Sequence, residues 1–75
     1  MTELRIPAAG DAVSEVQLVE WTVTDGATIS EGDVIYSIES EKSILDVESP
    51  ASGVLRILEQ PGATLAVGHL VGRID

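Results

Sequence analysis

The fold is decided by the stretch Asp25-Gly26-Ala27-Thr28-Ile29, which returns 36 positions later as Pro61-Gly62-Ala63-Thr64-Leu65. The same shift aligns further pairs: Val19 with Leu55, Trp21 with Ile57, Gly32 with Gly68, Val34 with Leu70, Ile35 with Val71 and Ile38 with Ile74. Five identities in one register favour a true repeat over a chance recurrence of Gly-Ala-Thr in a turn-rich chain. A half of about 36 residues is too small to hold a core alone, so we expect the halves, about 17–39 and 53–75, to pack against each other.

Short apolar segments separated by turn residues predict an all-β fold. Two of these segments alternate apolar with polar residues, as half-buried strands do. The alternation places these residues on the inner face: Val19, Trp21, Val23, Val34, Tyr36 and Ile38. No stretch keeps a helical apolar stripe for three turns. With the repeat, this pattern predicts one domain over residues 1–75, a flattened β-barrel or sandwich of two roughly four-stranded antiparallel sheets with pseudo-two-fold symmetry.

The composition argues against several classes of function. Thirteen acidic and four basic side chains give a net charge of −9, which repels nucleic-acid phosphates and anionic membranes and favours basic protein partners. A chain of this size buries only about 60% of its surface, so a large catalytic cleft is not expected. Without cysteine, any sulfur chemistry must come from a bound group. No apolar run reaches the roughly 20 residues of a membrane span, and the first residues lack an apolar signal core, so we expect a soluble intracellular domain.

The only lysine of the chain, Lys42, lies in the segment that joins the two halves. A small soluble domain usually scatters several lysines over its surface, so a single amine at this position is a candidate site of chemistry. We expect Val34–Glu39 and Ile44–Glu48 to form the strands of a hairpin, with residues 40–43 as its tight turn. Lys42 would then project into solvent from the centre of the turn, next to Glu41.

The run from Glu39 to Gly53 resembles the lysine-attachment region of lipoyl domains, which belong to the acyltransferase subunits of 2-oxo acid dehydrogenase complexes. The matching positions are Glu39, Lys42, Val47, Ser49, Pro50 and Gly53, with Asp46 keeping an acidic position, whereas Glu41 and Ser43 depart from the family pattern. The likeness extends upstream through Pro7 to Asp11, Val19 to Trp21, Gly26 and Glu31 to Val34. The resemblance thus covers nearly the whole chain and implies a fold of the hammerhead or barrel-sandwich hybrid type.

What the resemblance implies is an amide between the Lys42 ε-amine and the carboxyl group of lipoic acid, made by a separate lipoate ligase or lipoyl transferase. The domain is then a carrier without catalysis of its own, within a dihydrolipoamide acyltransferase subunit. By family likeness, the arm visits a thiamin-diphosphate 2-oxo acid decarboxylase, an acyltransferase core and a dihydrolipoyl dehydrogenase, and tethering raises its effective concentration at each. The expected context is the N-terminal part of a larger subunit, or a stand-alone carrier, in bacterial or archaeal cytoplasm or the mitochondrial matrix.

The resemblance also assigns recognition of the attachment turn to Glu39, Glu41, Ser43 and Asp46. The three carboxylates, together with Glu48, are placed to steer a basic enzyme surface toward the hairpin. Charged turn residues also serve simply as a solvated face, and this interpretation stays open.

Two further alternatives remain at this point. Biotin carriers share the architecture, but their lysine usually lies between methionines, and the only methionine here is Met1. Glu41 and Ser43 therefore favour lipoic acid, with a biotinyl carrier or an unmodified acidic interaction module as the alternatives. The segment from Ala8 to Ser14 is either a second recognition surface or a plain connection between strands.

The remaining conspicuous residues favour structural roles. Trp21 and Tyr36 are expected in or beside the core, and His69, with no second histidine or cysteine nearby, at a surface turn. The carboxylates near Lys42 lack the spacing of a calcium loop, so no metal is expected. The repeated glycines are expected to form turns, because no helix follows them and the spacing of a phosphate-binding loop is absent.

Overall fold

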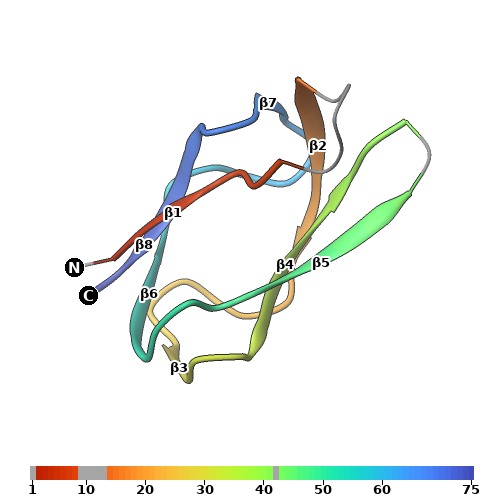
Figure 1. Cartoon of the computed structure of the whole chain (residues 1–75). Coiled ribbons are helices and arrows are strands. Elements are labelled where there is room, and N and C mark those ends of the chain that lie inside the picture. The colour runs from red at the N-terminus through yellow and green to blue at the C-terminus, as the bar shows by residue number, and fades with distance from the viewer. Residues whose placement is uncertain (1, 9–13, 42) are drawn as a thin grey trace.

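The computed structural model describes residues 2–8, 14–41 and 43–75, and these form two antiparallel sheets of four strands each (Figure 1). The strands are β1 Thr2–Arg5, β2 Glu15–Trp21, β3 Thr28–Ile29, β4 Val34–Glu39, β5 Ile44–Glu48, β6 Gly53–Ile57, β7 Thr64–Ala66 and β8 Leu70–Ile74. Their order is β1-β8-β6-β3 in one sheet and β5-β4-β2-β7 in the other. The predicted all-β class is confirmed. Over the described ranges, no helix is long and apolar enough to cross a bilayer.

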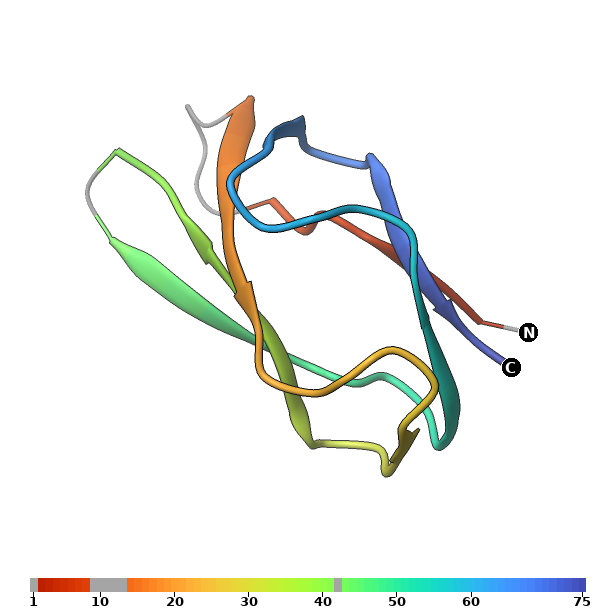
Figure 2. The same ribbon diagram turned by 180° about the vertical axis from the view of Figure 1, so that it is seen from behind.

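The two sheets share one internal plan. Each runs from a longer edge strand through two central strands to a short edge strand, and the connections after β2 and β6 cross the barrel at opposite ends (Figure 2). The amide of Gly26 donates to Leu55 O and the amide of Gly62 donates to Leu18 O, both at 2.7 Å. Both glycines lie in the left-handed region, with φ of 86° and 94°, which glycine adopts at little steric cost. The prediction that these residues form turns is confirmed.

A β-bulge in β2 changes which residue faces the core. After Leu18, the pairing with β4 skips Val19, so that Leu18 takes the place equivalent to Leu55. Leu18 and Leu55 are both fully buried, and the amide of each donates to an alanine carbonyl of the opposite half at 2.9 Å. Val19 is 39% exposed. The prediction that Val19 faces the core is wrong, because the extra residue of the bulge turns its side chain outward.

Strand β4 is buried on both faces rather than on one. Residues 35–38 are all buried, whereas Val34 is exposed beside a second bulge. The inward positions of Tyr36 and Ile38 are confirmed, and that of Val34 is wrong. A central strand with neighbours on both sides thus anchors the hairpin expected around Lys42.

The core is aliphatic except for one aromatic pair. Its buried members are Leu4, Ile6, Val16, Leu18, Ile29, Ile35, Tyr36, Ile38, Leu55, Leu65, Val71 and Ile74. Trp21 is half-buried against Tyr36, with ring centroids 4.9 Å apart, which confirms the core or near-core placement of both. The position equivalent to Tyr36 in the second half is Gly72, where an added Cβ would lie 2.7 Å from Arg56 O and 3.3 Å from Trp21 Cη2. The Trp21 ring of the first half therefore occupies space that Gly72 of the second half leaves free.

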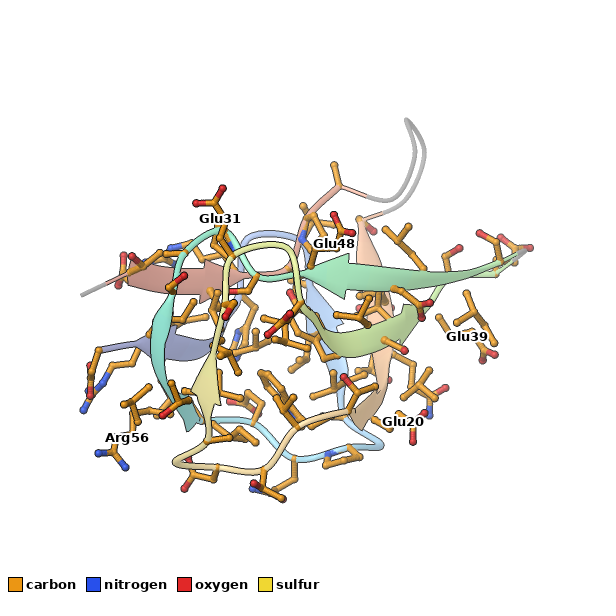
Figure 3. The ribbon with its side chains drawn as sticks, turned by 90° about the horizontal axis from the view of Figure 1, so that it is seen from below. Glu20, Glu31, Glu39, Glu48 and Arg56 are labelled. Atoms are coloured by element: carbon orange, nitrogen blue, oxygen red, sulfur yellow. The ribbon has the colours of Figure 1, made fainter. Side chains whose placement is uncertain are left out.

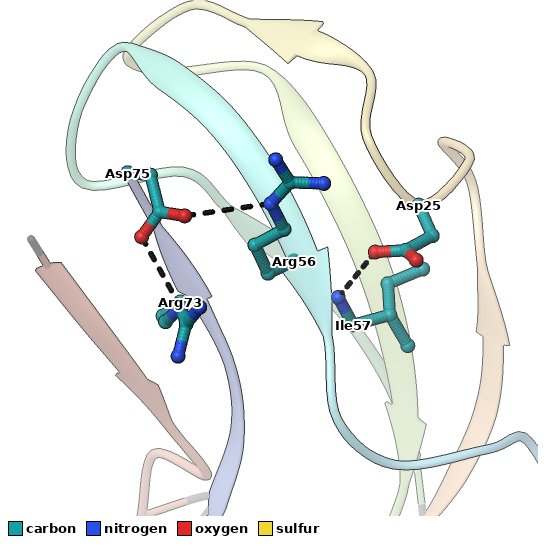
Figure 4. Close-up of polar contacts among 5 residues, drawn as sticks. All are labelled: Asp25, Arg56, Ile57, Arg73 and Asp75. Carbon is teal, nitrogen blue, oxygen red and sulfur yellow. Dashed lines mark hydrogen bonds and ion pairs between the residues drawn. The ribbon is translucent and has the colours of Figure 1, made fainter.

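Polar contacts hold the outer side of the β1-β8-β6-β3 sheet (Figure 4). Arg56 and Arg73 face each other directly across β6 and β8, and like charges in this position repel. The Asp75 carboxylate offsets the repulsion, since it pairs with Arg73 Nε at 3.1 Å and Arg56 Nε at 3.4 Å. Asp25 Oδ1 accepts a hydrogen bond from the Ile57 amide at 2.8 Å, which ties the first half to β6.

Candidate functional site

The hairpin of β4 and β5 has the strand bounds that the sequence predicts, Val34–Glu39 and Ile44–Glu48. The Ser40 amide donates to Ser43 O at 2.9 Å, which closes the chain around the two positions between them. The Ser40 hydroxyl reaches the same carbonyl at 3.3 Å. Lys42, the predicted attachment residue, lies outside the described residues, so its exposure and contacts stay predictions. Its neighbours Glu41 and Ser43 are both exposed.

The two strands of the hairpin differ sharply in burial. β4 is buried from 35 to 38, whereas β5 is exposed except for a half-buried Val47. Ile44 and Leu45, the first two residues of β5, are 62% and 43% exposed. The hairpin therefore extends past the barrel, on the side away from the adjacent start of β1 and end of β8 (Figure 1). A buried strand on one side and an open edge on the other make its tip accessible to a partner surface.

The structure separates the four predicted recognition residues into two groups. Glu39, Glu41 and Ser43 are exposed around the tip. Asp46 is exposed as well, but its Oδ1 accepts a hydrogen bond from the buried Ser37 hydroxyl at 2.9 Å. Sequence reasoning missed Ser37, although counting back from a turn at 40–43 places it opposite Asp46.

The second part of the family-like run belongs to the barrel and lies away from the tip. Ser49 is buried, and its backbone exchanges hydrogen bonds with the turn at Gly32 and Asp33. A Cβ at Gly53 would lie 2.5 Å from Asp75 O and 2.6 Å from Ile74 Cγ2, so this position requires glycine. Ser49 and Gly53 thus shape the connection from β5 to β6. Of the run from Glu39 to Gly53, the part near Lys42 is the candidate for chemistry.

Other predicted residues fall as follows. Of the possible recognition segment from Ala8 to Ser14, residues 9–13 lie outside the described part of the chain. His69 is exposed at a turn, as predicted, with Nε2 3.2 Å from Glu59 Oε1. Within the described ranges, no three histidine, cysteine or carboxylate side chains gather as a metal site. Burial raises the pKa of Tyr36 to about 12, so this phenol stays neutral under ordinary conditions.

The arginines of the molecule lie in one sheet, whereas the charged side chains on the strands of the other sheet are all carboxylates. The strands of the β5-β4-β2-β7 sheet contain no lysine or arginine and five carboxylates, on Glu15, Glu20, Glu39, Asp46 and Glu48. The three arginines, Arg5, Arg56 and Arg73, all belong to the other sheet. Glu20 and Glu39 point away from one side of the barrel, and Arg56 points away from the opposite side (Figure 3). The sheet that bears the hairpin therefore presents an acidic outer face, which complements a basic partner.

A small barrel of two sheets that extends one hairpin, with the only lysine of the sequence between the exposed residues Glu41 and Ser43, has the architecture of a carrier domain. Comparison with known proteins gives the family. The sequence model described as "Biotin-requiring enzyme", which covers biotin and lipoyl domains, matches residues 2–74, and the chain belongs to this family. The likeness to lipoyl domains predicted from Glu39 to Gly53 is confirmed.

The relatives include the dihydrolipoyllysine-residue acetyltransferase component of the pyruvate dehydrogenase complex from Staphylococcus aureus, which is 34% identical over 74 residues. The same component from Staphylococcus epidermidis is also 34% identical over 74 residues. In both cases the match covers 97% of this chain and 17% of the relative, so the chain spans about a sixth of the length of these proteins.

A solved structure has the same fold. The lipoyl domain of the 2-oxoglutarate dehydrogenase complex from Azotobacter vinelandii superimposes with a TM-score of 0.82, over 100% of this chain and 96% of that one. The sequence identity is 22%, so this likeness concerns the fold alone.

Proposed function

We propose that this protein is a lipoyl carrier domain in which the ε-amine of Lys42 forms an amide with the carboxyl group of lipoic acid. The observation that carries the proposal is the exposed tip of the β4–β5 hairpin, where the lysine of the sequence stands between exposed Glu41 and Ser43. A modifying enzyme needs access to the amine and a fixed approach, and an edge hairpin anchored by a buried central strand supplies both.

The residues of the hairpin fit this role. Amide formation joins the lysine nitrogen to the activated lipoyl carbonyl carbon and releases the activating group, so the domain contributes only its nucleophilic amine. Lipoic acid, once bound, supplies a disulfide that accepts electrons and an acyl group, which this cysteine-free chain has no other means to provide. The described residues around the tip offer hydroxyls and carboxylates but no thiol, so nothing there competes for the disulfide.

The relatives support a wider role. We propose that the domain shuttles acyl groups and electrons between a thiamin-diphosphate decarboxylase, an acyltransferase core and dihydrolipoyl dehydrogenase, without catalysis of its own. The relatives named as acetyltransferase components of the pyruvate dehydrogenase complex support this assignment. The acidic face around β5 favours basic docking surfaces on these enzymes and on a lipoate ligase or lipoyl transferase. The compartment proposed is bacterial or archaeal cytoplasm, or the mitochondrial matrix.

Biotin is the second candidate, because the family covers both kinds of carrier. The choice is tested by incubating the purified chain with lipoate ligase, lipoic acid and ATP, and in parallel with biotin ligase, biotin and ATP, followed by intact-mass measurement. Lipoylation at one site, with no biotinylation, is the expected result. Biotinylation alone would contradict the lipoyl assignment and indicate a biotinyl carrier. Modification by neither ligase would favour an interaction module. Lys42→Arg is the matched control, since it keeps the positive charge but cannot form the amide.

A further inference from the structure

A single side-chain hydrogen bond links the open edge strand of the hairpin to the buried strand beside it. Ser37 Oγ donates to Asp46 Oδ1 at 2.9 Å, and the two residues are direct cross-strand partners in β4 and β5. Ser37 is only 7% exposed, whereas Asp46 is exposed. A hydroxyl at this depth is costly to leave without an acceptor, so the bond favours one position of Asp46 over others.

This bond matters because β5 has little else to hold it. Ile44 and Leu45 are exposed, and Val47 is the only residue of the strand that packs against the core. Apolar burial therefore contributes little to the register of β5, and a slip by one residue would exchange the two faces of the strand. Between the core and the tip, the Ser37–Asp46 pair reinforces the backbone ladder with a contact that only one register permits.

We infer that Asp46 is a positioning residue, which fixes the register and direction of β5 through Ser37 and so presents the Lys42 turn to the modifying enzyme. The inference rests on the proposed lipoyl function and changes the role expected for Asp46. Recognition by charge requires its negative carboxylate, whereas positioning requires only an acceptor oxygen at Oδ1. Asparagine keeps that oxygen and lacks the charge, so the two roles are separable by experiment.

The test compares Asp46→Ala, Asp46→Asn, Ser37→Ala and the double variant Ser37→Ala/Asp46→Ala. Two quantities are measured: kcat/KM for modification by lipoate ligase, and hydrogen exchange of the β5 amides. Each alanine variant should lower kcat/KM and speed β5 exchange by roughly five-fold, the equivalent of one net hydrogen bond, and the double variant should do no more. Asp46→Asn should recover most of both losses. Glu31→Ala, on an exposed carboxylate in the turn before β4 and so at the end of that strand away from the tip, controls for net charge.

Three outcomes would overturn the inference. The first is an Asp46→Asn variant as slow as Asp46→Ala beside a normal Ser37→Ala, which would assign the carboxylate to charge recognition. The second is normal kcat/KM in both alanine variants. The third is unchanged β5 exchange in both, whatever the state of Lys42. If the protein without substitutions is not lipoylated but hydrogen exchange of the β5 amides changes as expected in the variants, the proposed function fails. The role of the Ser37–Asp46 pair in fixing β5 then stands.

Discussion

Leu18→Ala and Val19→Ala differ by one position, yet the structure predicts very different losses of stability for them. Leu18 is fully buried, and removing its side chain atoms leaves a cavity in a tightly packed core, at a cost of about 3 kcal/mol. Val19 is 39% exposed at the bulge of β2, and its truncation should cost no more than about 0.5 kcal/mol. Leu55→Ala is the matched control, because Leu55 occupies the equivalent buried place in the second half and should behave like Leu18→Ala.

The assay is urea unfolding followed by the fluorescence of Trp21, the only tryptophan of the chain, whose ring packs against Tyr36. A domain of this size has a total stability of about 4–11 kcal/mol. With an m-value of roughly 1 kcal/mol per molar urea, Leu18→Ala should lower the midpoint by about 3 M and Val19→Ala by less than about 0.5 M. Equal losses, or a larger loss for Val19→Ala, would refute the bulge. Val19 would then face the core, as its alignment with Leu55 at a shift of 36 residues predicts.

Three further predictions follow from particular side chains. Gly72→Ala should cost about 1–3 kcal/mol in urea unfolding, because its Cβ would lie 2.7 Å from Arg56 O; a neutral effect would show that β6 and β8 separate freely. Since burial raises the pKa of Tyr36 from 10.0 to about 12, the unfolded state ionises first as the pH rises, and roughly 3 kcal/mol of stability should be lost between pH 10 and 12. Tyr36→Phe should remove this loss, and a pH profile that stays the same in that variant would contradict the assignment. Lys42→Ala should abolish modification while changing the free energy of unfolding by less than about 0.5 kcal/mol, and extensive unfolding would refute the exposed turn.

The sequence predicts the strands of the hairpin and the turns well because both depend on local chemistry. Alternating apolar residues and the pairs Gly26/Gly62 and Gly32/Gly68 report directly on strands and on left-handed turns. The bulge in β2 was not predictable in this way, because a β-bulge depends on the partner strand and leaves no sign in the alternation of one segment. Val19 looked like the counterpart of Leu55 for that reason.

A second relation between the halves was hidden by a longer connection. Ile6 and Ser49 make equivalent backbone bonds, to the turns at His69 and Asp33, although they are 43 rather than 36 positions apart. Residues 6–14 join β1 to β2, whereas only 49–52 join β5 to β6, so the repeat loses its register at this point. A search at a single shift cannot find β1 and β5 as counterparts.

The candidate site, like the fold, has one part that local sequence predicts and another that depends on how the strands pair. Lys42 and its neighbours are predicted from a local run of sequence, and the exposure of Glu39, Glu41 and Ser43 follows from a turn. The hydrogen bond of Asp46 to Ser37 could not be predicted from its charge, because it depends on the register of two strands. Residues that act through a neighbour need the fold before they can be assigned.

Proteolytic peptide mapping of the ligase-treated chain tests the central claim most directly. The expected result is one lipoyl amide, carried by the peptide that contains Lys42 and absent from the Lys42→Arg variant. A lipoyl group on the N-terminal amine instead, a biotinyl group on Lys42, or an unmodified Lys42 after exhaustive treatment would contradict the account.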